Sequence, residues 1–181
     1  MEFIESRLEG CFLIKPAKFS DLRGEFVKTF NDEEFRSRRL TPVFKEQYYS
    51  SSNKDVIRGM HFQLPPYDHD KLVYCTAGRV LDVLVDLRKD SATFGEYYSV
   101  ELSADNAHMM YISKGIAHGF LTLSESATMI YNVTSVYHSE FDTGISWDSF
   151  NFRWPVANPI MSERDQALIP FDEFKSPFVN V

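Results

Sequence analysis

The segment "RVLDVLVDL", residues 79–87, carries the pattern that decides the fold. The apolar residues at every second position are Leu81, Val83, Val85 and Leu87. Asp82 and Asp86 fall on the opposite face of an extended chain. A period of two is typical of a β-strand, because successive side chains of a strand point to opposite sides. We therefore expect a strand here.

Similar patterns recur along most of the chain. In "YYSVELS", residues 97–103, the alternating residues are Tyr98, Val100 and Leu102. Further strands are expected near residues 12–15, 25–30, 43–50, 56–63, 71–77, 108–112, 117–123 and 127–136. The 16 Phe and 9 Tyr residues suit a pleated, half-buried surface. Many short strands predict an all-β sandwich or barrel, in a single domain over residues 1–181.

Helix is predicted at only two places. In "NDEEFRSRRL", Asn31 is a suitable N-cap, with acidic residues in the first turn and basic residues in the last. In "SERDQAL", Ser162 is followed three residues later by Asp165, which is similar to a capping box. Both helices should be short and peripheral.

Composition limits the partners. A formal net charge of −7 argues against binding to nucleic acid or to an anionic membrane surface, although a few local cations could hold a small anion. Cys11 and Cys75 are two thiols without a disulfide framework, so we expect them to be reduced. We expect a cytoplasmic protein without a membrane span.

The stretch "DVIRGMHFQLPP", residues 55–66, does not fit a strand that only builds a core. In a regular strand Arg58 and His61 would point to opposite sides. Gly59 lies between them, and a glycine inside a strand often marks a bulge that redirects side chains. A bulge would let both residues reach one cavity. The alternative is a solvated arginine beside a histidine of the core.

A second glycine-flanked histidine, His118, lies in "ISKGIAHGF". Two such histidines suggest a cupin-type jelly roll, some of which bind metals. Here the first segment reads His-x-Gln, and a tight metal site needs three or four ligands. We therefore expect no metal.

Acid–base chemistry remains, with four candidate groups. His61 is the natural base, because an imidazole exchanges protons near neutral pH. Lys71 could stabilise an oxyanion, or could be an ordinary solvated lysine. Tyr131 should share the inner face with Met129 and could be a tyrosine of the core. Asp165 could simply cap a helix.

Taken together, the sequence resembles the dTDP-4-dehydrorhamnose 3,5-epimerase family. The matching segments are "FSDLRGEFVKTF", "FKEQYYSSS", "VIRGMHFQLPP", "KLVYCTAGRVLDVLVDLRKDSATFG", "LSADN", "ISKGIAHGFLTLSESATMIYNVTSVY", and "WP" with "PIMSERD". They follow the family's order from about residue 19 to residue 165. The resemblance implies a cupin jelly roll, and a homodimer whose N-terminal strands exchange between subunits.

The resemblance also assigns roles. It implies that His61 is the catalytic base, that Asp165 orients it, that Tyr131 is the general acid and that Lys71 holds the C4 oxygen. The substrate-binding residues that it implies are Arg58, His118, Tyr137, Phe19 and Arg23. The substrate would be a nucleotide-linked 4-keto-6-deoxy sugar, used for surface polysaccharide biosynthesis. The keto group acidifies the hydrogens on C3 and C5, so that no cofactor is needed.

The sequence departs from the family at the nucleotide-binding positions. Lys28 stands where the family usually has an acidic residue, and Glu46-Gln47-Tyr48 replaces its usual Gln-x-Asn. A mismatch of polar groups costs roughly 1–3 kcal/mol per group, so the accepted base should change. We therefore expect a GDP-linked hexose or heptose, with CDP or dTDP as alternatives.

Other activities remain open at the level of sequence. We expect inversion at both C3 and C5, and the alternative is inversion at C3 alone. A 3,4-ketoisomerase on the same fold would pass through a similar enolate. A non-catalytic sugar-nucleotide binding module is the alternative from another class.

Overall fold

The computed structural model describes residues 1–179, and most of its regular structure is β-strand. The strands are β1 (Glu2–Glu5), β2 (Phe12–Lys15), β3 (Lys18–Asp21), β4 (Gly24–Val27), β5 (Glu46–Asn53), β6 (Ile57–Gln63), β7 (Lys71–Ala77), β8 (Arg79–Asp86), β9 (Tyr97–Ser103), β10 (Met109–Ile112), β11 (Ile116–Thr122), β12 (Ser126–Val133) and β13 (Asp142–Gly144). The helices are α1 (Asp32–Arg36), α2 (Glu163–Gln166) and the 3₁₀ turn η1 (Phe171–Glu173).

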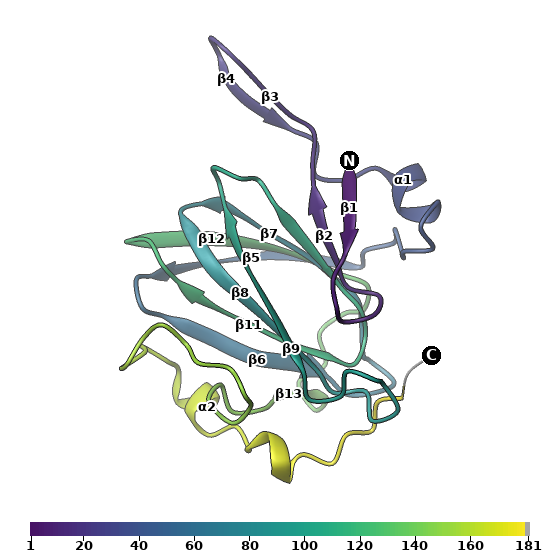
Figure 1. Cartoon of the computed structure of the whole chain (residues 1–181), viewed down its shortest axis with the longest axis vertical. Helices are drawn as coiled ribbons and strands as arrows, with labels where there is room; N and C mark the ends of the chain where they lie inside the picture. The colour runs from purple at the N-terminus through teal and green to yellow at the C-terminus, as the bar shows by residue number, and fades with distance from the viewer. Residues whose placement is uncertain (180–181) are drawn as a thin grey trace.

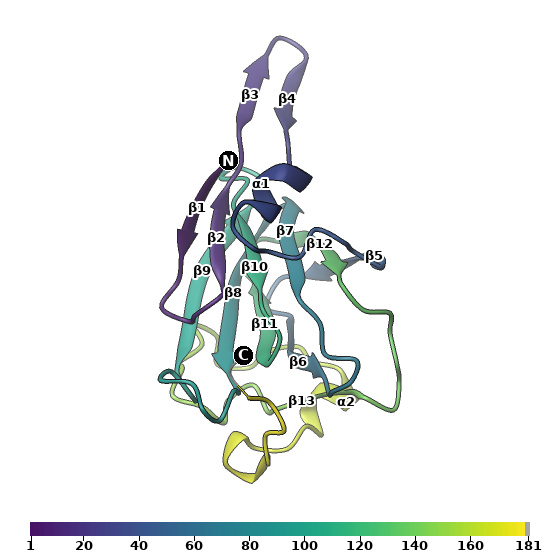
Figure 2. The ribbon, with the colours of Figure 1, turned by 90° about the vertical axis from the view of Figure 1, so that its right-hand side faces the viewer.

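All strands except β3 and β4 form two antiparallel sheets that pack against each other (Figures 1 and 2). The six-stranded sheet has the order β1-β2-β10-β7-β12-β5, and the five-stranded sheet has the order β13-β6-β11-β8-β9. Neighbours in space are mostly distant in sequence, as in a jelly roll. The predicted all-β jelly roll with short peripheral helices is confirmed.

The apolar face predicted for residues 79–87 packs outside the core between the sheets. Only the opposite face of β8 belongs to that core. Val80 and Leu84 of β8 point into this core, together with apolar residues of β7, β10 and β12. Val83 and Val85 point the other way and pack under the C-terminal segment. Both faces of β8 are therefore buried, and Asp82 lies inside the barrel rather than in solvent.

The outer faces of the sheets are covered by the chain ends. The C-terminal segment, yellow in Figure 1, runs across the five-stranded sheet and contributes Phe150, Trp154 and Phe178 to a second cluster. The first helix, α1, places Phe35 against Tyr111 of the six-stranded sheet. Within the described residues, no helix is both long and apolar enough to span a lipid bilayer.

Both predicted helix caps are confirmed. The side chain of Asn31 accepts a hydrogen bond from the Glu34 amide, and Ser162 accepts one from the Asp165 amide. Strands β1, β3 and β13 were missed, because they are short and show little alternation. The predicted strands at 25–30, 43–50 and 127–136 were shifted or too long at one end.

Strands β3 and β4 form a hairpin that projects from the barrel (Figures 1 and 2). It pairs with neither of the two large sheets. Its apolar side chains are exposed: Phe19 to 63%, Phe26 to 61% and Leu22 fully. Exposed aromatic side chains gathered on one ribbon form an apolar surface of a kind that monomeric proteins rarely expose.

The bulge predicted at Gly59 is present. His61 lies opposite His118 and Arg58 lies opposite Phe120, so that two residues of β6 face the single Gly119 of β11. Gly59 has a φ of +140°, which L side chains rarely adopt. A Cβ at Gly59 would lie 2.5 Å from the Cα of Gly119. The two glycines thus let β6 and β11 approach closely where β6 bends.

Replacing Gly59 with alanine should lower the free energy of unfolding by at least about 2 kcal/mol, because a strained φ and a backbone clash add. Urea denaturation followed by fluorescence measures this loss. Gly24→Ala is the matched control, since Gly24 also has a positive φ but a Cβ there meets nothing within 4 Å. Equal losses in the two variants would contradict the close approach at Gly59.

Candidate active site

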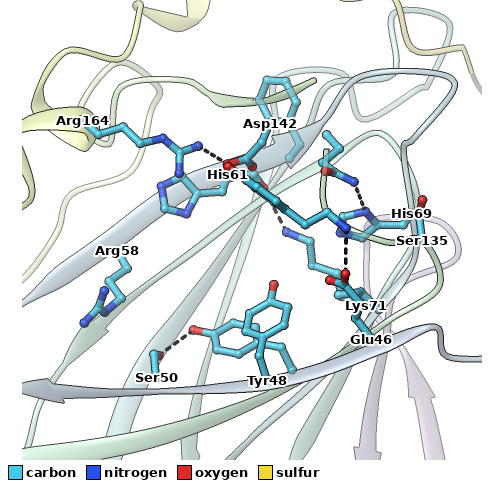
Figure 3. A pocket seen from close by; sticks show the side chains of 15 residues that line it. Glu46, Tyr48, Ser50, Arg58, His61, His69, Lys71, Ser135, Asp142 and Arg164 are labelled. Carbon is cyan, nitrogen blue, oxygen red and sulfur yellow. Dashed lines mark hydrogen bonds and ion pairs between the residues drawn. The ribbon is translucent and has the colours of Figure 1, made fainter. Parts of the chain in front are cut away.

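A cavity of about 400 Å³ opens between the two sheets at one end of the barrel (Figure 3). Seven of the residues selected from sequence line it: Glu46, Tyr48, Arg58, His61, Lys71, Tyr131 and Tyr137. They come from β5, β6, β7, β12 and the loop after β12. Strands far apart in sequence therefore bring the predicted acid, base and cations to one place.

His61 and Asp165 form a dyad at the wall of this cavity. Nε2 of His61 lies 2.8 Å from Oδ1 of Asp165. The other carboxylate oxygen accepts the backbone N–H of Gly59 at 3.2 Å, so the bulge also anchors the carboxylate. Burial alone would raise the pKa of Asp165, but the hydrogen bonds from His61, Gly59 and Ser162 hold it below its usual value. Asp165 is therefore an ionised acceptor.

This contact assigns a role to each nitrogen of His61. An ionised Asp165 accepts the proton on Nε2, which leaves Nδ1 of the neutral ring as the nitrogen with a free lone pair. The imidazolium that forms on proton uptake would be stabilised by the same carboxylate. The helix-capping alternative for Asp165 is wrong, since Ser162 is the cap and the carboxylate points to His61.

Lys71 is a buried cation of the cavity. Its side chain is 7% exposed, and Nζ donates to the backbone carbonyl of His61 at 3.2 Å. Burial lowers the pKa of Lys71 to about 8, against the opposing effect of Asp142 and Asp82. The ammonium therefore stays mostly protonated at pH 7. The alternative of a solvated lysine is wrong.

Tyr131 faces the cavity from the opposite sheet. Its hydroxyl lies 3.2 Å from Oγ of Ser50, and its ring stacks on Tyr48 with centroids 4.8 Å apart. Burial raises the pKa of Tyr131 far above its usual value, and the nearby Tyr48 and Asp82 raise it further. The phenol is therefore protonated at any physiological pH and can act as a proton donor.

Arg58 reaches the same cavity through the bulge. Its guanidinium donates to Oγ of Ser52 at 2.8 Å and to the carbonyl of Ser51 at 3.2 Å. Both acceptors are neutral, so the positive charge remains available to an anionic ligand. The prediction that Arg58 and His61 share one cavity is confirmed, and the alternative of a separate solvated arginine is wrong.

His118 occupies a different place from the one expected. It is 3% exposed and does not line the cavity, and Nε2 bonds to Oδ1 of Asp82 at 2.7 Å. Its ring meets Tyr131 edge-on with centroids 6.2 Å apart. His118 therefore supports Tyr131 from behind, because β11 turns this side chain toward the interior of the barrel.

The rim of the cavity contains residues that the sequence reasoning missed. Asp142 of β13 and Arg164 of α2 form an ion pair across the opening at 2.6 Å (Figure 3). The carboxylate of Glu46 accepts the backbone N–H of Tyr137 at 3.1 Å. No pattern marked Asp142, which lies in a three-residue strand, but Arg164 could have been suspected because it precedes Asp165.

Three predicted nucleotide-binding residues do not reach this cavity. Phe19, Arg23 and Lys28 belong to the projecting hairpin or follow it directly, and none of them lines the cavity. Arg23 instead bonds to Asp21 of the same hairpin. Within one chain, these three residues are therefore separated from the catalytic residues, whereas Glu46 and Tyr48 lie beside them.

The site offers no cluster of metal ligands. Among residues 1–179, no group of three or more His, Cys, Asp or Glu side chains is arranged to hold a metal ion. Cys11 and Cys75 are both free and buried. The cavity does present an imidazole bonded to a carboxylate, the phenol of Tyr131 and three cationic side chains, those of Arg58, Lys71 and Arg164.

The chain matches known proteins along nearly its whole length. The sequence profile described as dTDP-4-dehydrorhamnose 3,5-epimerase matches residues 5–173. The protein of that name from Escherichia coli K12 is 42% identical over 177 residues, which cover 96% of each chain.

Solved structures agree with this match. The dTDP-6-deoxy-D-glucose-3,5-epimerase of Legionella pneumophila, in complex with dTDP-4-keto-L-rhamnose, has a TM-score of 0.94 at 32% identity and 99% coverage of both chains. A 3'-monoepimerase from Streptomyces bikiniensis, in complex with dTDP-quinovose, has a TM-score of 0.87 at 28% identity, covering 91% of this chain and 85% of that one.

Proposed function

The chain belongs to the dTDP-4-dehydrorhamnose 3,5-epimerase family, and we propose that it inverts C3 and C5 of a dTDP-linked 4-keto-6-deoxy hexose. Its family makes it an epimerase that acts on a nucleotide-linked sugar. One observation carries this proposal. The His61–Asp165 dyad and the phenol of Tyr131 face one cavity from opposite sheets, with the ammonium of Lys71 lining the same space.

The reaction follows from the acidity of hydrogens beside a ketone. Nδ1 of His61 removes the proton from C3 or C5, and the electron pair moves onto the C4 oxygen. Lys71 stabilises the resulting enolate by its charge. Tyr131 then delivers a proton to the opposite face of the same carbon, which inverts the centre. Solvent restores the protonation of both groups.

The dTDP assignment replaces the expectation of a GDP-linked hexose or heptose. The relatives named above act on dTDP-linked sugars or hold them, and none supports GDP or a heptose. The GDP expectation rested on Lys28, Glu46 and Tyr48. Of these residues, Glu46 and Tyr48 line the cavity, whereas Lys28 follows the hairpin and lies outside the cavity of its own chain.

The proposal is tested by incubating the protein in D₂O with dTDP-, CDP- and GDP-linked 4-keto-6-deoxyhexoses and recording NMR spectra. We expect deuterium at C3 and C5, together with inverted product, fastest with the dTDP sugar. Binding without any exchange would contradict an epimerase and favour a binding module. A carbonyl found at C3 would favour a ketoisomerase.

Inversion at C3 alone is the second candidate, because a structural relative is named a 3'-monoepimerase. The same spectra separate the two. Deuterium at C3 with an unchanged hydrogen at C5 after complete turnover would establish the C3-only reaction.

The reaction should slow at high pH because Lys71 must be protonated, so a plot of kcat against pH should have a falling alkaline limb. Burial lowers the pKa of Lys71 to about 8, so kcat should fall as the pH rises through about 8, where the neutral amine no longer stabilises the enolate. Lys71→Met should lower kcat at pH 7 by about 10²-fold or more and remove this limb. A wild-type kcat that stays constant up to pH 10 would contradict the role of Lys71. Initial rates measured from pH 6 to pH 10 decide this.

We also propose a homodimer in which the β3–β4 hairpin of one subunit covers the cavity of its partner. Strand β5 is one of the two edge strands of the six-stranded sheet and lines the cavity with Glu46, Tyr48 and Ser50. The hairpin has exposed aromatic residues and lies away from its own cavity. Docking on a partner would bring the Phe19 and Arg23 side chains near a nucleotide.

Light scattering should therefore give twice the chain mass for the wild-type protein. Phe26→Ser combined with Phe19→Ser should give monomers with a raised KM, because the hairpin surface loses its apolar contacts. Ile169→Ser, an exposed apolar residue elsewhere on the surface, is the control and should leave the mass unchanged. A wild-type monomer with full activity would overturn the exchanged hairpin.

A further inference from the structure

An ion pair joins β13 to α2 at the opening of the cavity. Nη2 of Arg164 lies 2.6 Å from Oδ2 of Asp142, and both residues line the cavity (Figure 3). The side chain of Asp142 is only 15% exposed, whereas that of Arg164 is half exposed. This pair is therefore part of the cavity wall on one side and reaches solvent on the other.

The pair is placed next to the catalytic dyad by the chain itself. Arg164 and Asp165 are neighbours in α2, a helix of four residues. Arg164 bonds to β13, and Asp165 bonds to His61 of β6. Strands β13 and β6 are themselves paired, with Gly144 opposite His61. The adjacent side chains of Arg164 and Asp165 therefore hold α2 against the paired strands β13 and β6.

From this arrangement, the geometry points to the Asp142–Arg164 ion pair as a positioning pair, an inference that rests on the proposed epimerisation. Arg164 holds α2 so that Asp165 stays against His61. Asp142 supplies negative charge to the Lys71 side of the cavity.

The charges around Lys71 support the second role. Asp142, His69 and Lys71 line the same cavity. The negative charges of Asp142 from β13 and Asp82 from β8 raise the pKa of Lys71, and the charge of Lys71 lowers the pKa of His69. Asp82 is already hydrogen-bonded to His118. The field of Asp142 raises the pKa of Lys71 against the larger effect of burial. Because Arg164 is bound to Asp142, the pair should modulate how strongly Lys71 holds its proton.

An ordinary exposed ion pair would do neither of these things. Arg36 and Asp32 of α1 form such a pair at 2.7 Å, with both side chains more than half exposed. Pairs of that kind contribute little, because water and salt screen them. The Asp142–Arg164 pair differs through its buried carboxylate and its position in the cavity wall.

Asp142→Asn and Arg164→Gln provide the test, since they should act in opposite directions on Lys71. Removing the carboxylate should move the alkaline limb of kcat to lower pH. Removing the guanidinium leaves Asp142 unpaired, so the limb should move to higher pH. Both variants should lose about tenfold or more in kcat at pH 7, because α2 loses one of its two fastenings. Arg36→Gln should change neither property.

A direct titration keeps this inference separate from the proposed function. The resonances of Lys71 in [¹³C]lysine-labelled protein, assigned by their loss in Lys71→Met, report its protonation without any substrate. Opposite shifts of the Lys71 pKa in the two variants support the electrostatic role even if no sugar is turned over. Shifts in the same direction, or none, overturn that role.

The positioning role is tested by measuring whether the hydrogen bond between His61 and Asp165 stays intact in the variants. In ¹⁵N NMR spectra, the proton on Nε2 of His61 should remain fixed in the wild-type protein and exchange faster in Arg164→Gln. An unchanged Nε2 proton together with an unchanged kcat in Arg164→Gln overturns the positioning role. If the wild-type protein exchanges no substrate hydrogen at all, the proposed function fails, and the Nε2 proton alone decides this role.

Discussion

Replacing His61 with asparagine is expected to lower the rate of hydrogen exchange at both C3 and C5 by about 10³-fold or more. Asparagine keeps a similar polar shape but cannot take up a proton. His61 is the only histidine whose ring is bound to Asp165 and also lines the cavity, among the residues that the structure describes. Rates of deuterium incorporation in D₂O, measured by NMR, give the loss directly.

Two further variants sharpen the test of His61. Asp165→Asn should also lower kcat strongly while leaving KM nearly unchanged, because an amide can fix the wrong tautomer of the imidazole. His108→Asn is the control, since His108 does not line the cavity. Exchange by His61→Asn within about tenfold of the wild-type rate at either carbon would contradict its role as the base.

Replacing Tyr131 with phenylalanine should separate proton removal from inversion. His61 can still remove the proton, and the same group can return a solvent proton to the same face. We therefore expect continued deuterium exchange without inversion, and a loss of inverted product of about 10²-fold or more. The retained phenyl ring still stacks on Tyr48, so the cavity should keep its shape.

Tyr111→Phe is the matched control for Tyr131→Phe. Tyr111 is also a buried tyrosine; its hydroxyl donates to Asp70, and neither residue lines the cavity. This variant should lose stability with its buried hydrogen bond, but the ratio of inversion to exchange should stay that of the wild-type protein. A Tyr131→Phe variant that inverts either centre at the wild-type rate would show that another group delivers that proton.

The sequence predicted those parts of the structure that depend on local patterns. The alternation of residues 79–87 gave a strand, and Gly59 between Arg58 and His61 gave the bulge that turns both into one cavity. Asn31 and Ser162 gave the helix starts. In each case the chemistry of a few neighbouring residues determines the local conformation.

Contacts between distant segments were beyond local reasoning. The ion pair between Asp142 and Arg164 depends on how the C-terminal segment crosses the five-stranded sheet. His118 was expected at the cavity wall, yet the register of β11 turns it toward Asp82. The isolated position of the β3–β4 hairpin also depends on tertiary packing, because its sequence only indicates a short exposed ribbon.

The central claim is that His61 and Tyr131 move protons on opposite faces of one sugar. The most direct measurement is a single turnover of the wild-type protein on the dTDP-linked 4-keto sugar in D₂O, quenched and examined by NMR for both configuration and isotope at each carbon. We predict that every inverted centre carries deuterium. Inverted centres that keep their original hydrogen would contradict this account.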